Sequence, residues 1–116
     1  MLYTGCKFDQ YEGIAIEVTA HAKHFLAPDW ALIKAYKEQR ITWAQYEAEY
    51  VAQLRTLYRV KRSEFLMCVL GIAAEAAVSS VTIVCFERGD ETTVLCHRRI
   101  LAGVIRKVAA RNGYVI

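Results

Sequence analysis

A short run of β-branched residues constrains the fold of this chain most. Residues 80–86 read Ser-Val-Thr-Ile-Val-Cys-Phe, with almost no polar interruption. Such a run is typical of a central strand of a parallel sheet that is covered on both faces. A polar segment over residues 87–93 follows, and apolar residues at 3/4 spacing from about His97 predict a final helix. We therefore expect a buried strand that leads through a loop to a helix.

The rest of the chain predicts further strands and helices. The apolar segment 2–8 and the alternating segment 13–19 predict two strands. Helices are expected after Pro28, from the capping box that begins at Thr42 to about residue 58, and over 63–78. Asp29 can cap the first helix, Gly113 can end the last, and residues 114–116 can add a short strand. We expect an α/β fold: a three-layer sandwich with a mostly parallel, Rossmann-like sheet and helices on both faces.

Length and composition indicate one domain over residues 1–116. The longest apolar stretch, over 65–74, is too short for a membrane span, so no membrane partner is expected. The N-terminal residues lack the pattern of a signal peptide, which predicts a cytoplasmic protein. Its four cysteines are then expected to be reduced thiols.

The net charge of +3 is unevenly distributed. One basic run lies in residues 55–62, and a second, over 98–111, lies in a C-terminal segment with no acidic residue after Cys96. Two interpretations stay open: a solvated basic face, or a surface that attracts a phosphate-bearing small molecule or nucleic acid.

Reactive side chains concentrate where the buried strand ends and the last helix begins. Ligands bind beyond the carboxyl ends of parallel strands, so both sets should face one crevice. The helix start would favour the thiolate of Cys96, His97 could move a proton, and Glu87 could act as a base. We take Cys96, Glu87 and His97 as catalytic candidates. The ligand-binding candidates are Arg98, Arg99, Cys85 and, from the first strand, Cys6, Tyr3 and Thr4.

Purely structural roles are open for these same residues. Cys85 and Cys68 can be small buried apolar groups, Glu87 can pair with an arginine, and His97 can cap or pack. His21 and His24 are expected at the surface. No Cys-x-x-Cys or His-x-x-x-His pair is present, so no metal site is predicted. A glycine-rich phosphate loop and a serine nucleophile elbow are also missing, and no cofactor is predicted.

The C-terminal motifs resemble the domain-of-unknown-function 488 family. The resemblance rests on Val-Thr-Ile-Val-Cys-Phe-Glu over 81–87 and Leu-Cys-His-Arg-Arg over 95–99, and extends upstream to segments 26–30, 36–37 and 41–50 and to the opening Tyr-Thr. The positions that match are Cys85, Glu87, Cys96, His97 and Arg98. Longer members carry Asp-Val-Arg after the second strand, whereas this chain has Glu-Val-Thr-Ala over 17–20. Its short length fits compact members, some encoded by bacteriophages.

Three functions are compatible with these features. The first is a small transferase or hydrolase that acts on a nucleotide or nucleic-acid component through the Cys/Glu/His/Arg cluster. The second is a non-catalytic nucleotide- or nucleic-acid-binding module. The third is a protein-interaction role, for example a phage factor that binds a host protein through an exposed patch of Trp30, Trp43, Tyr46 and Tyr50. The oligomeric state is left open.

Overall fold

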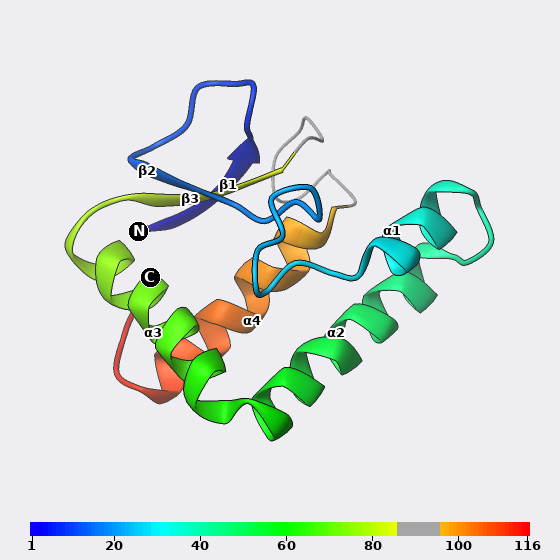
Figure 1. Ribbon diagram of the computed structural model, residues 1–116. Coiled ribbons are helices and arrows are strands. Elements are labelled where there is room, and N and C mark those ends of the chain that lie inside the picture. Colours follow the sequence, from blue (N-terminus) through cyan, green and yellow to red (C-terminus); the bar gives the residue numbers. More distant parts are fainter. Residues whose placement is uncertain (86–95) are drawn as a thin grey trace.

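Four helices and three strands make up the described part of the chain. The computed structural model describes residues 1–85 and 96–116 (Figure 1). In chain order the elements are β1 (Leu2–Cys6), β2 (Ile14–Glu17), α1 (Trp30–Lys37), α2 (Trp43–Val60), α3 (Arg62–Val78), β3 (Val81–Cys85) and α4 (His97–Arg111). The mixed α/β content expected from the sequence is confirmed.

The three strands form one parallel sheet in the order β1-β3-β2. In register, Leu2 lies opposite Val81 and Cys6 opposite Cys85, while Ile14 pairs with Val81 from the other side. Every residue of β3 is buried. The prediction of a central, buried parallel strand is confirmed, because β3 has neighbours on both edges and cover on both faces.

The two faces of the sheet have different cover. Leu2, Val81 and Ile83 belong to one apolar cluster with side chains of α3 and α4. On the opposite face, Thr82 Oγ1 donates to the carbonyl oxygen of Glu12 at 2.6 Å, so the segment between β1 and β2 folds over that side. The described residues therefore show helices packed on one face of the sheet, and a three-layer sandwich is not confirmed.

Gly13 is required where this segment turns back into β2. Its φ is +67°, in the left-handed region that glycine adopts without strain. A Cβ here would lie 1.9 Å from the carbonyl oxygen of Ser80. The absence of a side chain thus lets the Ile14 N–H donate to that same oxygen at 3.0 Å and fixes the start of β2.

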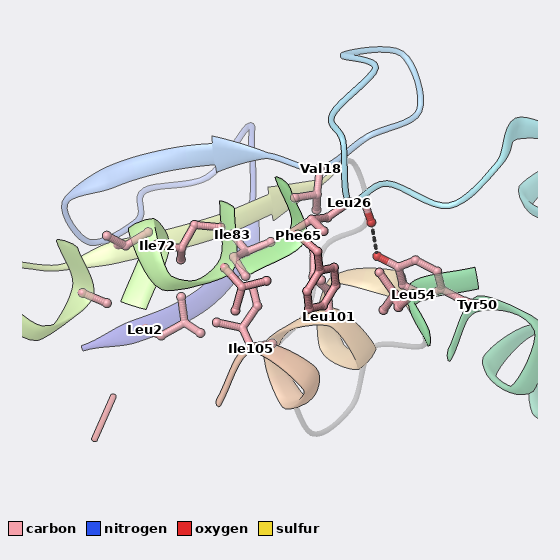
Figure 2. Close-up of a cluster of buried hydrophobic side chains, with 14 residues drawn as sticks. Leu2, Val18, Leu26, Tyr50, Leu54, Phe65, Ile72, Ile83, Leu101 and Ile105 are labelled. Carbon is pink, nitrogen blue, oxygen red and sulfur yellow. Dashed lines mark hydrogen bonds between the residues drawn. The ribbon is translucent and has the colours of Figure 1, made fainter. Parts of the chain in front are cut away.

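The buried hydroxyl of Tyr50 forms a hydrogen bond that joins two distant segments of the core. Figure 2 shows Tyr50 of α2 reaching the chain that precedes α1, where its hydroxyl donates to the carbonyl oxygen of Leu26 at 2.5 Å. Both side chains are fully buried. Burial, with smaller contributions from Tyr46 and Cys96, raises the pKa of Tyr50 well above its ordinary value of 10.0. Tyr50 therefore stays neutral and able to donate.

The structure confirms some of the helix ends that the sequence predicted. Thr42 forms the capping box with Gln45 that the sequence predicts. Asp29 stands at the N-cap of α1, but its side chain makes no capping hydrogen bond. Gly113 follows α4 with a φ of +89°, as expected of a residue that ends a helix. Residues 114–116 form no strand; the Ile116 carbonyl accepts from the Leu2 N–H at 3.2 Å.

The sequence predicted no membrane-spanning segment. Within residues 1–85 and 96–116, none of them has the length and apolar character needed to cross a bilayer.

Replacing Tyr50 with Phe tests the hydroxyl bond. The variant leaves the Leu26 carbonyl buried without this donor, which should cost about 1–3 kcal/mol of unfolding free energy at pH 7, measured by urea denaturation. The same change at the exposed Tyr58 should cost little. Above about pH 10 the unfolded chain releases the Tyr50 proton while the folded chain keeps it, so the wild-type advantage over Tyr50→Phe should shrink. An advantage that grows with pH would contradict the assignment.

Candidate functional site

The carboxyl ends of two strands and the start of the last helix meet in one place. Cys6 and Cys85 end β1 and β3 as register partners, and the Lys7 N–H donates to the Cys85 carbonyl oxygen at 2.8 Å. Cys96 stands at the N-cap of α4, followed by His97. The structure thus brings Cys85, Cys96, His97 and Arg98 together at this edge of the sheet.

The two thiols of Cys85 and Cys96 are in direct contact. Their Sγ atoms lie 2.6 Å apart, and both residues are buried. Behind them, Arg98 Nη1 donates to Cys85 Sγ at 3.0 Å. Arg98 is completely buried, so water screens the interaction of its charge with the nearby thiols only weakly. A guanidinium in this position favours negative charge on the pair of sulfurs.

His97 links the thiols to the end of β2. Its Nε2 lies 2.6 Å from the carbonyl oxygen of Val18, and its Nδ1 lies 3.8 Å from Cys96 Sγ. A carbonyl oxygen accepts only, so Nε2 must carry the ring proton. In the neutral ring, Nδ1 then has the lone pair that can accept the proton of the Cys96 thiol. The Tyr50 ring packs edge-on against the imidazole, with centroids 6.1 Å apart, and fixes its plane.

A cavity of about 610 Å³ opens onto Cys96 and His97. This volume is in the range of small-molecule sites. Four tryptophan and tyrosine side chains line it, and Cys85 and Arg98 are not among its described lining residues. The remaining lining residues come from the end of β2 and the segment after it, from α1 and from the first turn of α2: Thr19, Ala20, His21, Trp30, Ile33, Tyr36, Lys37, Trp43 and Tyr46.

The aromatic walls form a connected stack. The rings of Trp43 and Tyr46 are stacked with centroids 5.2 Å apart, and Tyr36 contacts both at 5.5 and 5.2 Å. Trp30 is 61% exposed at the mouth, whereas Tyr46 and Tyr50 are buried. The exposed patch of four aromatic residues expected for a protein-interaction factor therefore does not form, since half of its members belong to the interior.

Several predicted site residues lie elsewhere. Arg99 is exposed and lines a different cavity, between α2 and α4. Tyr3 and Thr4 lie in β1 and do not line the Cys96 cavity; Thr4 Oγ1 is buried and has no hydrogen-bond partner among the described residues. Cys6 is buried beside Cys85 in the sheet. Glu87 lies outside the described residues.

The sequence did not predict most of the residues that line the Cys96 cavity. Lys37 and His21 place two nitrogen-bearing side chains at the lining. His21 is exposed, as the sequence predicted. His24, also expected at the surface, is half-buried; its Nδ1 accepts from the Leu26 N–H, and burial lowers its pKa. The available signal was the helical spacing of Trp43 and Tyr46 just after the capping box at Thr42.

Residues 17–20, where the sequence departs from the pattern of the family that it resembles, contain an ion-paired carboxylate. Glu17 contacts Lys7, and Thr19 Oγ1 donates to Glu17 Oε2 at 3.1 Å. Lys7, more than any other neighbour, lowers the pKa of Glu17 and keeps it charged. Glu17 thus joins the ends of β1 and β2, and Thr19 is left to line the cavity.

Within the described ranges, no three His, Cys, Asp or Glu side chains are grouped so that they could hold a metal ion.

The protonation state of His97 gives a direct test of this geometry. Nitrogen-15 chemical shifts of the imidazole should show the proton on Nε2 at neutral pH, because Val18 accepts it there. A predominant Nδ1–H form would contradict the arrangement, since that ring could not accept a proton from Cys96.

The comparisons with known proteins give one match. No curated protein and no solved structure matches the chain significantly. A family model described as "Active DUF488-N3 subclade" matches residues 11–109. This range covers most of the chain and includes the five positions on which the resemblance was based: Cys85, Glu87, Cys96, His97 and Arg98. The chain therefore belongs to the domain-of-unknown-function 488 family.

Proposed function

We propose that this protein is a thiol-dependent enzyme, a small transferase or hydrolase that acts on a nucleotide or nucleic-acid component. The observation that carries the proposal is the position of Cys96. Cys96 lines a cavity with aromatic side chains, and its thiol is next to an imidazole whose proton-bearing nitrogen is held by a backbone carbonyl. A nucleophile, an adjacent base and a third group that orients the base form the usual arrangement for nucleophilic catalysis.

The proposed reaction has two displacements. His97 Nδ1 takes the Cys96 proton, and the thiolate sulfur attacks an electrophilic carbon of the substrate. The sulfur–carbon bond forms as the bond to the leaving group breaks; the leaving group keeps the electron pair and receives the proton from His97. Water, or an acceptor hydroxyl, then gives its proton to His97 while its oxygen displaces the sulfur. The protonated ring finally returns this proton to the thiolate.

Cys85 and Arg98 act as positioning residues in this proposal. Arg98 donates to Cys85 Sγ, and Cys85 touches Cys96, so the positive charge stabilises an anionic sulfur through one intervening thiol. Complete burial keeps the guanidinium away from the ligand. We therefore assign Arg98 to the support of the nucleophile and not to the binding of a substrate anion.

The walls of the cavity support the substrate class. Trp30, Tyr36 and Trp43 offer flat faces on which a nucleobase can stack. Lys37 and His21 lie on the same lining and can meet a phosphate. The description of the matched subclade as active supports an enzyme without naming a reaction.

A nucleophilic thiol needs reducing surroundings, so we propose that the protein acts in the cytoplasm. The phage origin and the Rossmann-like, three-layer arrangement stay predictions from the sequence, and the proposed reaction requires neither.

Turnover should depend on Cys96. The probe is a panel of nucleosides, nucleotides and short oligonucleotides, with released base, phosphate or transferred product followed by chromatography. Cys96→Ser should lower the rate about a thousandfold or more, because an essential nucleophile is lost. His97→Gln should also lower it, and Cys68→Ser, on α3, should leave it unchanged.

Intact mass after acid quenching should show a covalent adduct on wild-type protein and none on Cys96→Ser. Melting temperatures near that of wild type show that the variants fold. Full activity in folded Cys96→Ser, or no turnover of any panel member by wild type, would contradict the proposal.

Ligand entry should be visible in intrinsic fluorescence, because both tryptophans of the chain line the cavity. Nucleoside monophosphates should quench this emission saturably. Lys37→Ala should weaken the binding of the monophosphate about five- to tenfold, because a charge-assisted contact is removed. The affinity for the uncharged nucleoside should not change. Lys34→Ala, one turn earlier on α1 and outside the cavity, is the matched control. Equal effects of the two variants would exclude Lys37 as the phosphate contact.

A further inference from the structure

A second cavity brings together the two basic runs that are separate in the sequence. A groove of about 570 Å³ lies between α2, α3 and α4, and its lining includes Arg55 from the first run and Arg99, Lys107 and Arg111 from the second. All four are exposed. Glu47 is the acidic residue that lines the groove, so the lining carries an excess of positive charge. The proposed enzyme reaction does not use this groove.

The α4 wall of the groove has two parallel rows. Ile100, Val104 and Val108 follow one another every fourth residue and are half-buried. Arg99 and Lys107 precede them by one position, in a row that ends at Arg111. Residues four apart lie on the same side of a helix, so an apolar row runs beside a cationic row. The apolar row packs only partly against the core and leaves apolar surface in the groove.

The α2 wall continues the pattern. Val51 is half-buried, Leu54 is buried, and Tyr58 is 41% exposed. Arg55 lies one turn from Val51 and adds its charge to this side. The groove therefore has an apolar floor between two helices and cations on both walls.

Gly103 leaves the middle of the α4 cationic row open. It is exposed, and a Cβ built on it would meet nothing within 4 Å. Glycine in a helix interior costs about 1 kcal/mol relative to alanine. Its effect here is a notch between Arg99 and Lys107 where another backbone can approach closely.

We propose that this groove binds an amphipathic helix of a partner protein, with an apolar stripe flanked by acidic residues. The stripe would cover the apolar floor, and the carboxylates would pair with the cations. At 1.5 Å per residue, Lys107 and Arg111 lie about 12 and 18 Å along α4 from Arg99, the span of acidic residues eight and twelve positions apart on a partner helix. A nucleic acid could contact the cations and stack on the exposed ring of Tyr58. It fits less well than a helix because it would leave the aliphatic row of Ile100, Val104 and Val108 uncovered.

The test uses a fluorescein-labelled synthetic helix with leucines at positions i, i+3, i+4 and i+7 and glutamates on the flanks. Anisotropy should show saturable binding to the full chain. Lys107→Glu should weaken it about tenfold, while Lys34→Glu, the same charge change outside the groove, should not. Gly103→Leu should abolish binding by filling the notch, and Gly103→Ala shows that a substitution here preserves the fold.

Three results would overturn the proposal. The first is no saturable binding, or binding that Lys107→Glu and Gly103→Leu leave unchanged. The second is a thymidine oligonucleotide that displaces the peptide and depends on Lys107 but not on Gly103, which would assign the groove to nucleic acid. The third is self-association of the unliganded chain that Gly103→Leu abolishes. Peptide binding that persists in Cys96→Ser separates this inference from the proposed reaction.

Discussion

The guanidinium of Arg98 lies entirely out of contact with solvent at the start of α4. Removing such a charge from water costs several kcal/mol unless groups of the protein compensate it. Cys85 accepts from Arg98 at 3.0 Å and touches Cys96, which places two polarizable sulfurs where the charge is greatest. A cation held in this way stabilises a thiolate. Arg98, Cys85 and Cys96 therefore form one connected group at the start of α4.

The sheet order places Cys85 at this site. β3 lies between β1 and β2. Its last residue, Cys85, pairs with Cys6 of β1, and on the β2 side the Val18 N–H donates to the neighbouring Val84 carbonyl oxygen at 3.0 Å. The chain leaving β2 supplies the Val18 carbonyl that orients His97. Tyr50 packs against the same ring and is held in turn by Leu26. Cys96, His97 and Arg98 are thus positioned by the ends of two strands and the first turn of one helix, while α1 and α2 contribute aromatic side chains to the cavity.

The sequence predicted those parts that depend on local pattern. The β-branched run identified the buried strand, the capping box identified the start of α2, and a reactive cluster was expected where β3 ends and α4 begins. Long-range packing was harder to predict. Helices on both faces were expected from the usual form of parallel sheets, but Thr82 and Glu12 show a loop segment against the second face. Arg98 was expected to bind an anion, and only tertiary structure reveals its complete burial. The spacing of Trp43 does not indicate that it lines two cavities.

If His97 and Arg98 activate the Cys96 thiol, as we propose, the activation should appear in the alkylation rate of that residue. Native protein would be treated with iodoacetamide at neutral pH, and each cysteine followed by peptide mass spectrometry. Cys68 is the internal reference, because burial raises its pKa above the ordinary value. We predict that Cys96 is alkylated faster than Cys68. His97→Gln and Arg98→Met should each lower the alkylation rate of Cys96 and leave that of Cys68 unchanged. A Cys96 rate no greater than that of Cys68, or one unchanged in both folded variants, would contradict it.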